Sequence, residues 1–441
     1  LEKSPAMLAV IAGAIRAGVV FLPLNPAYTA AEVSYFIGDA GAKLLVCDGA
    51  REAGLRPVAE AAHAMLRVLN PDGSGSFAGM AGDPGPVVAR GRDDLAALLY
   101  TSGTTGRSKG AMLSHGNLLS NAEVLTEAWG FTNRDVLLHA LPVFHTHGLF
   151  VATNVALIAG CPMIFLPKFD ADAVFAALPL ATAMMGVPTF YTRMLADARL
   201  TREAMGHMRL FVSGSAPLLA ETHREWEART GHRILERYGM TETNMNTSNP
   251  LAGDRRAGTV GRALPGVEVR VCDENGAGFP RGEIGAVEVR GPNVFRGYWG
   301  MPEKTRAELR DSGFFITGDL GVMDADGYLT IVGRGKDLII SGGLNVYPKE
   351  VEMAIDALPG VVESAVVGVP HGDFGEAVVA VVVGGVTAEQ VMTGIAGALA
   401  RFKQPKHVAV VADLPRNAMG KVQKNLLRER FGGVFALGSP N

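Results

Sequence analysis

Through about the first 330 residues, stretches with helical spacing of apolar residues alternate with short apolar runs. The spacing predicts helices over residues 6–17 and 30–41, and the apolar runs at 19–23 and 43–47 predict strands after them. This alternation is typical of parallel strands covered by helices. The pattern therefore predicts an α/β fold with layered subdomains for most of the chain.

The pattern changes twice toward the C-terminus. Short strands bounded by glycine predict a smaller β-rich subdomain at about 268–332. After it we expect a helix at 348–358, strands at 364–369 and 377–383, a helix at 387–402, a strand at 407–411 and a Lys-rich segment. About a hundred residues in this α+β order can form their own core. We therefore predict a large N-terminal domain at 1–333 and a small, mobile C-terminal domain at 334–441.

The longest uncharged run, residues 148–167, has the ~20 residues that a membrane-spanning helix needs. Asn154 and the turn signal Gly160-Cys161-Pro162 interrupt it, so we interpret it as a buried helix, a turn and a strand. Arg16 breaks the first apolar stretch, and no signal peptide is evident, although a segment before Leu1 could have carried a targeting signal.

Composition and charge narrow the choice of partners. The 41 Lys and Arg nearly balance 44 Asp and Glu, so we expect no nucleic-acid or membrane partner. A hydrophobic share of 48% with 55 glycines favours a layered enzyme over a disordered chain. Cys47, Cys161 and Cys272 show no disulfide or zinc spacing, which favours a reducing, cytoplasmic compartment.

A polar loop follows the apolar strand expected at 95–100. Residues 101–110 hold three glycines, five hydroxyl side chains and Lys109. Backbone N–H groups, hydroxyls and an ammonium together can hold phosphate oxygens. The loop is not a Walker A sequence, because no glycine lies directly before Lys109, and Gly110 rather than Ser or Thr lies directly after it. A flexible surface loop is the alternative, but the position before a helix expected near Asn117 favours phosphate binding.

The loop resembles the phosphate-loop signature of the adenylate-forming enzymes, which include acyl-CoA synthetases, luciferases and peptide-synthetase adenylation domains. Four more segments resemble the family's motifs in the family's order: 236–242 (ERYGMTE), 317–319 (TGD), 333–337 (GRGKD) and 415–421 (PRNAMGK). The resemblance covers nearly the whole chain. Family members usually carry roughly sixty more residues before the first helix seen here.

The resemblance implies where ATP and Mg²⁺ bind. The nucleotide-binding residues would be Thr101, Ser102, Gly103, Thr104, Thr105, Gly106, Lys109, Ser215, Ala216, Pro217, Glu236, Tyr238, Gly239, Met240, Thr241, Asp319 and Arg334. Thr104, Thr105 and Lys109 would hold the β- and γ-phosphates, and Glu242 with Thr105 would bind Mg²⁺. Asp319 and Arg334 would bind the ribose, and Tyr238 would pack on the adenine opposite Ser215, Ala216 and Pro217.

The C-terminal motif implies a lid. Lys421, with Thr104 and Glu242, would be catalytic, and its ammonium would bridge the acid carboxylate and the α-phosphate. Because Lys421 lies far along the chain from the loop, the second domain must close over the first, with Lys336 as the hinge. Taken alone, a TGD tripeptide is an ordinary turn, Lys421 a solvated helix start and Lys336 a loop lysine. Their order with the other motifs favours the functional roles.

The acid pocket is the next implication. Residues 142–148 resemble the family segment that lines the acyl pocket, which makes His147 a candidate, although a buried structural histidine is the alternative. Arg193, Ser215 and Arg237 match the positions with which malonyl-CoA synthetases hold the distal carboxylate of malonate. An arginine there would exclude acetate, whereas methylmalonate differs by one methyl group and stays open.

Residues 341–348 resemble the family loop that meets the pantetheine tunnel, which implies coenzyme A as the thiol that accepts the acyl group. Ser341, Gly342 and Gly343 would contact it. No carrier domain follows residue 441, which counts against a peptide-synthetase module. The resemblance therefore implies an acid–thiol ligase that uses ATP, Mg²⁺ and coenzyme A.

Malonate is the expected acid, and methylmalonate or another short acid is the alternative. A non-catalytic nucleotide or acyl binder remains a second hypothesis, because the apparent N-terminal truncation threatens folding. The oligomeric state stays open.

Overall fold

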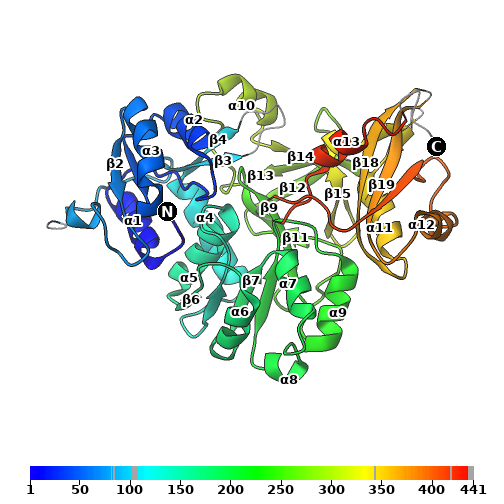
Figure 1. Ribbon diagram of the computed structural model, residues 1–441, viewed down its shortest axis with the longest axis horizontal. Coiled ribbons are helices and arrows are strands. Elements are labelled where there is room, and N and C mark those ends of the chain that lie inside the picture. Colours follow the sequence, from blue (N-terminus) through cyan, green and yellow to red (C-terminus); the bar gives the residue numbers. More distant parts are fainter. Residues whose placement is uncertain are drawn as a thin grey trace.

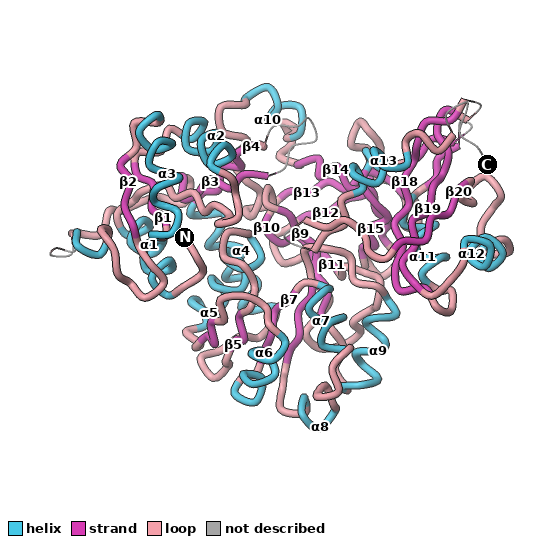
Figure 2. Tube along the Cα trace, in the orientation of Figure 1, coloured by secondary structure: helices cyan, strands magenta, loops and turns pink. Residues whose placement is uncertain are grey.

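The structure is a computed structural model that describes residues 1–80, 82, 85–101, 108–341, 344–372, 374–417 and 420–435. Figure 1 shows the blue N-terminal part at one end of the molecule and the orange and red C-terminal part at the other, with green and yellow segments between them. Figure 2, in the same orientation, shows helices and strands in each of these parts.

The first part of the chain packs helices on a short parallel pair of strands. Its elements are α1 (Pro5–Arg16), α2 (Ala30–Ala40), β1 (Leu44–Cys47), α3 (Gly49–Ala61), β2 (Met65–Val68) and the 3₁₀ helix η1 (Ala78–Met80). Helix α2 begins where Thr29 and Glu32 form a reciprocal capping box, and it ends at Gly41 with a φ of 62°. Val33 and Leu55 face the strands in a separate hydrophobic cluster.

A two-stranded antiparallel hairpin follows, made of β3 (Leu95–Thr101) and β4 (Lys109–Ser114). Thr101 pairs directly with Lys109, so the two residues that flank the polar segment lie opposite each other on neighbouring strands. The helix expected near Asn117 is confirmed by α4 (His115–Ala128), which starts at the cap residue Ser114, but the sequence analysis did not predict the strand β4 before it. The sequence of β4 has Ser and Gly among buried apolar residues, which hid the strand.

The central seven-stranded sheet has the order β11-β10-β9-β8-β7-β5-β6, and it is parallel except where β10 joins β9 and β11. Its strands are β5 (Leu137–His139), β6 (Met163–Phe165), β7 (Ala183–Gly186), β8 (Leu210–Ser213), β9 (Leu235–Met240), β10 (Asn244–Ser248) and β11 (Arg262–Ala263). The connecting segments are the π-helix η2 (His147–Thr153), α5 (Asn154–Ala159), α6 (Ala171–Ala177), η3 (Leu178–Leu180), α7 (Pro188–Leu195), α8 (Arg202–Met205) and α9 (Ala220–Thr230). The interpretation of 148–167 as helix, turn and strand is confirmed by η2, α5 and β6.

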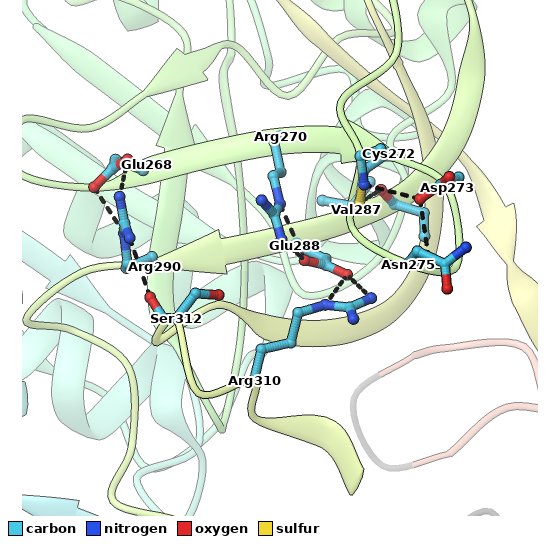
Figure 3. Close-up of polar contacts among 12 residues, drawn as sticks. Glu268, Arg270, Cys272, Asp273, Asn275, Val287, Glu288, Arg290, Arg310 and Ser312 are labelled. Atoms are coloured by element: carbon cyan, nitrogen blue, oxygen red, sulfur yellow. Dashed lines mark hydrogen bonds and ion pairs between the residues drawn. The ribbon is translucent and has the colours of Figure 1, made fainter. Parts of the chain in front are cut away.

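A four-stranded antiparallel sheet comes next, with the order β12-β13-β14-β15. Its elements are β12 (Glu268–Cys272), β13 (Ile284–Arg290), α10 (Pro302–Glu308), β14 (Phe315–Met323) and β15 (Leu329–Arg334). The Glu288 carboxylate is fully buried in this sheet, and the guanidinium groups of Arg270 and Arg310 reach it from two sides, each at 2.6 Å (Figure 3). Charge pairing therefore stabilises the interior of this sheet.

The C-terminal part builds its own core around a five-stranded sheet. Its elements are η4 (Gly335–Asp337), β16 (Ile339–Ser341), β17 (Leu344–Val346), α11 (Pro348–Asp356), β18 (Val361–His371), β19 (Gly375–Gly384), α12 (Ala388–Ile395), β20 (His407–Val411) and α13 (Lys424–Phe431). Val378 and Val382 of β19 pack toward α11 and α12, while Val379 and Val381 pack toward α13. The predicted α/β fold with a small α+β C-terminal part is confirmed, and the boundary between 333 and 334 stays a prediction.

Two elements differ from the sequence prediction. The helix expected at 387–402 ends at Ile395, since Gly394 and Gly397 weaken a helix there and turns follow. The apolar run at 19–23 forms only an isolated bridge between Phe21 and Ala97.

Within the described ranges, none of the helices has the length and hydrophobicity needed to cross a bilayer. The three cysteines are buried free thiols.

Candidate active site

The residues on either side of the predicted phosphate loop lie on β3 and β4. Thr101 ends β3, and its hydroxyl lies 3.4 Å from the Glu242 carboxylate. The predicted loop residues Ser102, Gly103, Thr104, Thr105 and Gly106 lie outside the described residues.

Lys109 starts β4 and is buried. Its ammonium lies 3.4 Å from Glu308 of α10 and 4.1 Å from the centre of the Tyr298 ring. The position of the Lys109 ammonium, which is predicted to bind phosphate, is therefore fixed by Glu308 and Tyr298.

Glu242 lies in the turn between β9 and β10, where its carboxylate is buried beside the hydroxyls of Thr101 and Tyr298. Burial raises the pKa of Glu242. A buried carboxylate beside hydroxyl groups and within electrostatic reach of Lys109 fits a role as a cation ligand. No group of three or more His, Cys, Asp and Glu side chains that could hold a metal occurs in the described part of the chain. One carboxylate completed by substrate phosphates is the arrangement that Mg²⁺ commonly uses.

The predicted ribose site is assembled across neighbouring strands. Asp319 of β14 pairs in register with Arg334 of β15, and their side chains form an ion pair of 2.8 Å. The Tyr238 hydroxyl donates a hydrogen bond of 2.5 Å to the other Asp319 oxygen. Burial, and then the charge of Asp319, raises the pKa of Tyr238 well above its usual value. Gly318 precedes Asp319 with a φ of 73°, which a side chain would disfavour.

The residues predicted around the adenine lie at the ends of β8 and β9. Ser215, Ala216 and Pro217 form the bend after β8, and Ser215 has a φ of 73°. Gly239, Met240 and Thr241 continue β9 into its turn. A Cβ on Gly239 would lie 1.8 Å from the Asn244 carbonyl oxygen, so the hairpin requires glycine there.

Glu236 points elsewhere. Its buried carboxylate lies 3.4 Å from Nδ1 of His223 on α9, and burial raises its pKa. Nucleotide binding by Glu236 stays a prediction.

The predicted acid pocket contains a buried arginine without a partner. Arg237 is 3% exposed, and its Nε and Nη2 atoms have no hydrogen-bond acceptor among the described residues. Burial lowers the pKa of Arg237 to about 9. A buried guanidinium without a counter-ion is costly, so this geometry is suited to an anionic ligand.

Polar groups surround this cation. His147 Nδ1 lies 3.1 Å from the Ser215 hydroxyl, while Nε2 of the same ring has no partner in the described structure. Burial, and then the charge of Arg237, lowers the pKa of His147 well below its usual value, so the ring is neutral. Ser213 and Thr146 add buried hydroxyls that likewise have no partner there. The structure thus brings together Arg237, His147 and Ser215.

Arg193 is not among them. Its side chain is exposed on α7, and its guanidinium lies 6.0 Å from the Phe169 ring. Contact of Arg193 with an acid stays a prediction.

The C-terminal motif lies near the residues of the predicted ribose site. The Lys421 side chain is exposed, but desolvation by the surrounding protein lowers its pKa, and the charge of Arg334 acts in the same direction. The Asp319 carboxylate opposes this shift, so both members of the ribose pair lie within electrostatic reach of Lys421. A Cβ on Gly420, which has a φ of 75°, would lie 3.2 Å from Thr189 of α7.

Of the residues predicted for the hinge and for coenzyme A binding, the structure describes Lys336 and Ser341. Lys336 is exposed in η4, and the adjacent Asp337 forms an ion pair of 2.6 Å with Arg428 of α13. Ser341 is buried at the end of β16. Gly342 and Gly343 lie outside the described residues.

Sequence reasoning missed Tyr298, Glu308 and Gly214. Tyr298 and Glu308 contact the loop lysine from a segment outside the five motifs. A Cβ on Gly214 would lie 2.3 Å from the Arg237 guanidinium, so the absence of a side chain lets the arginine lie there. No spacing rule would have revealed these contacts.

Comparison with known proteins gives two family matches. Residues 1–299 match the AMP-binding enzyme family, and residues 350–421 match the C-terminal domain of AMP-binding enzymes.

Curated relatives include several ligases. The chain is 35% identical to a malonate–CoA ligase of Arabidopsis thaliana, over 97% of this chain and 76% of that protein. It is 37% identical to a feruloyl-CoA synthase of Amycolatopsis sp., over 97% of this chain and 87% of that protein.

Solved structures give a higher identity. MatB from Rhodopseudomonas palustris with bound ATP is 61% identical, with a TM-score of 0.96 over 98% of this chain and 88% of that one. The apo form of MatB gives 0.84 over the same shares. The chain therefore belongs to the AMP-binding enzyme family and has its fold, with a large N-terminal and a small C-terminal domain.

Proposed function

We propose that this chain is an ATP-dependent malonate–CoA ligase, which forms malonyl-AMP and pyrophosphate and then malonyl-CoA and AMP. The observation that carries the proposal is the buried guanidinium of Arg237, which lies near His147 and Ser215 and whose Nε and Nη2 atoms have no acceptor among the described residues. Several of the relatives that the chain matches, including the Arabidopsis thaliana protein, are named malonate–CoA ligases, and this similarity supports malonate as the acid. The pocket charge favours an acid with a second carboxylate.

In the first half-reaction, a carboxylate oxygen of malonate attacks the α-phosphorus of ATP, and the bond from that phosphorus to pyrophosphate breaks. Lys109, Thr104 and Thr105 would hold the β- and γ-phosphates, and Lys421 would hold the attacking carboxylate against the α-phosphate. Each cation neutralises charge that develops on phosphate oxygens. Asp319 and Arg334 would hold the ribose.

Glu242, together with Thr105, would hold Mg²⁺. The ion would supply charge neutralisation at the phosphate oxygens. The burial of Glu242 keeps its charge unscreened for that role.

Arg237 would hold the distal carboxylate, with Ser215 and His147 as hydrogen-bond partners and Arg193 as a second arginine. A monocarboxylic acid would leave the buried charge of Arg237 unpaired, and sites of this kind reject such analogues by as much as ~10⁴-fold. One added methyl group is worth only ~10–200-fold, so methylmalonate is the alternative acid.

In the second half-reaction, the thiol of coenzyme A attacks the acyl carbon of malonyl-AMP, AMP leaves with the electrons of the broken C–O bond, and the thiol proton is released. The C-terminal domain, from residue 334 onward, would turn about Lys336 and present Ser341, Gly342 and Gly343 to the pantetheine arm. We place this chemistry in the cytoplasm, and cell fractionation tests that location.

The test is pyrophosphate exchange into ATP with a panel of malonate, methylmalonate, succinate, acetate and octanoate. We expect malonate to give the highest rate and Arg193→Ala to reduce exchange most with the diacids. Faster wild-type turnover of acetate than of malonate would contradict the assigned pocket. Folded, monodisperse protein that shows no exchange with any acid would support the binding-protein hypothesis instead.

Lys421→Ala separates the half-reactions. Adenylation should be abolished, while thioester formation from supplied malonyl-AMP should continue. An equal loss of both would show that Lys421 has another role.

A further inference from the structure

A carboxylate with no role in the proposed mechanism lies beside the predicted phosphate lysine. Glu308 ends α10 with its side chain 22% exposed, and its Oε2 atom lies 3.4 Å from the Lys109 ammonium. The same oxygen accepts a hydrogen bond of 2.6 Å from the Tyr298 hydroxyl. The Tyr298 ring in turn lies 4.1 Å from the ammonium. Lys109 is thus held by a carboxylate and an aromatic face.

The main chain fixes this arrangement. The Met112 N–H of β4 donates to the Gly297 carbonyl, and the Trp299 N–H donates to the Gly110 carbonyl, at 2.9 and 2.8 Å. The segment before α10 therefore runs along the edge of β4. Glu308 stays close to Lys109 because both are attached to this paired backbone.

The charge of Glu308 has a consequence for anion binding. Its carboxylate and a phosphate group compete for the same ammonium donors, and two anions near one cation repel each other. A carboxylate at this position must therefore weaken the hold of Lys109 on both ATP and pyrophosphate. Such weakening is useful once the adenylate has formed, because pyrophosphate then has to leave.

We propose that Glu308 is a positioning residue that takes over the Lys109 ammonium as pyrophosphate departs. The inference rests on the proposed role of Lys109 in phosphate binding. Lys304 sets the strength of the effect, because its ammonium lies 2.7 Å from the other Glu308 oxygen and shares the negative charge.

The test compares Glu308→Gln with Glu303→Gln. In the first variant, the glutamine side chain keeps the size of the glutamate and an oxygen for the Tyr298 hydroxyl but removes the charge. Glu303 is an exposed acid at the other end of α10, so its replacement removes the same charge away from Lys109. Steady-state kinetics with malonate would give KM for ATP, KM for malonate and the inhibition constant of pyrophosphate.

We expect Glu308→Gln to lower both KM for ATP and the pyrophosphate inhibition constant by about 2- to 5-fold, the range of a partly exposed ion pair. KM for malonate should stay at the wild-type value, and Glu303→Gln should change none of the three constants. Lys304→Gln should raise KM for ATP slightly, because Glu308 would then hold Lys109 more strongly.

A higher KM for ATP in Glu308→Gln, or equal changes for ATP and malonate, would overturn the inference and indicate a structural role. Melting temperatures of the variants show whether each one folds. If wild-type exchange with malonate is robust while Glu308→Gln behaves as wild type, only this inference fails. If the wild type shows no malonate-dependent exchange, the proposed function fails.

Discussion

Two buried charges in this protein have opposite surroundings. Glu288 in the four-stranded sheet is 0% exposed and holds Arg270 and Arg310 in ion pairs (Figure 3). Arg237 in the central sheet is 3% exposed, and no described acceptor lies within reach of its Nε and Nη2 atoms. A paired buried charge belongs to the fold, whereas an unpaired one destabilises the fold unless a ligand completes it.

The pKa shifts express the same difference. Burial alone would raise the pKa of Glu288, but hydrogen bonds from Arg310 and Arg270 and their charges outweigh it, so the pKa is lowered and the charge is favoured. At Arg237, burial lowers the pKa to about 9 and no carboxylate offsets it. The comparison predicts that substitutions at the two positions affect different properties.

The largest expected effect is on activity, from Arg237→Met. Methionine fills similar space without a charge, so kcat/KM for malonate should fall by about 10³- to 10⁴-fold, while the melting temperature stays the same or rises. Kinetics with malonate and acetate, together with thermal unfolding, check this. Arg224→Met removes an exposed, ion-paired arginine of α9 and serves as the control. A clear loss of stability in Arg237→Met would show that Arg237, like Glu288, stabilises the fold.

Glu288→Gln should act on stability instead. The two arginines lose their counter-ion, and because both are about a quarter exposed we expect a loss of about 2 kcal/mol in the free energy of unfolding. Urea titration measures it. Glu268→Gln removes an exposed acid paired with Arg290 in the same sheet and should be hard to distinguish from wild type. Unchanged stability in Glu288→Gln would contradict the inference that the paired charge of Glu288 stabilises the fold.

The contribution of Glu288 should also depend on pH. Its folded-state pKa is lowered, so the stabilisation is present above the unfolded-state pKa of about 4.3 and is lost as pH falls through the folded-state value. The difference in unfolding free energy between wild type and Glu288→Gln should be full at pH 7 and shrink in acid below pH ~4. A difference that grows in acid would contradict the pairing.

The smallest effect is expected from Gly214→Ala. The added Cβ would meet the movable end of Arg237, so the protein should fold, but a displaced guanidinium should lower kcat/KM for malonate by about tenfold. Kinetics with malonate and acetate measure the change. Gly13→Ala, where a Cβ meets no atom within 4 Å, is the matched control. Wild-type use of malonate by Gly214→Ala would show that the close approach does not position the arginine.

The sequence predicted the elements and motifs whose signal is local. The apolar pattern predicted the strand at His407–Val411. Short motifs placed Asp319 and Arg334 at one site, and the structure pairs these two residues. The full set of catalytic roles stays a prediction, as does any contact made by residues 102–107.

The rest depends on contacts between distant residues. Lys109 and Glu308 are 199 positions apart, and only the folded chain brings them together. Strand β4 was missed because Gly110 and Ser114 weaken its apolar pattern. The lack of a partner for Arg237 is likewise invisible in sequence, since it is a property of everything packed around the side chain.

Thr101 and Lys109, which flank the predicted phosphate loop, lie on the separate β3–β4 pair, while residues of the predicted acid site lie where β8 and β9 of the central sheet end. Substitutions that reshape the pocket therefore need not disturb the strand pair that carries the loop. We therefore expect that natural substitutions can change which acid is bound without changing the residues that bind the nucleotide. Changing the acid specificity of this fold by substitution should therefore be easier than changing its nucleotide specificity.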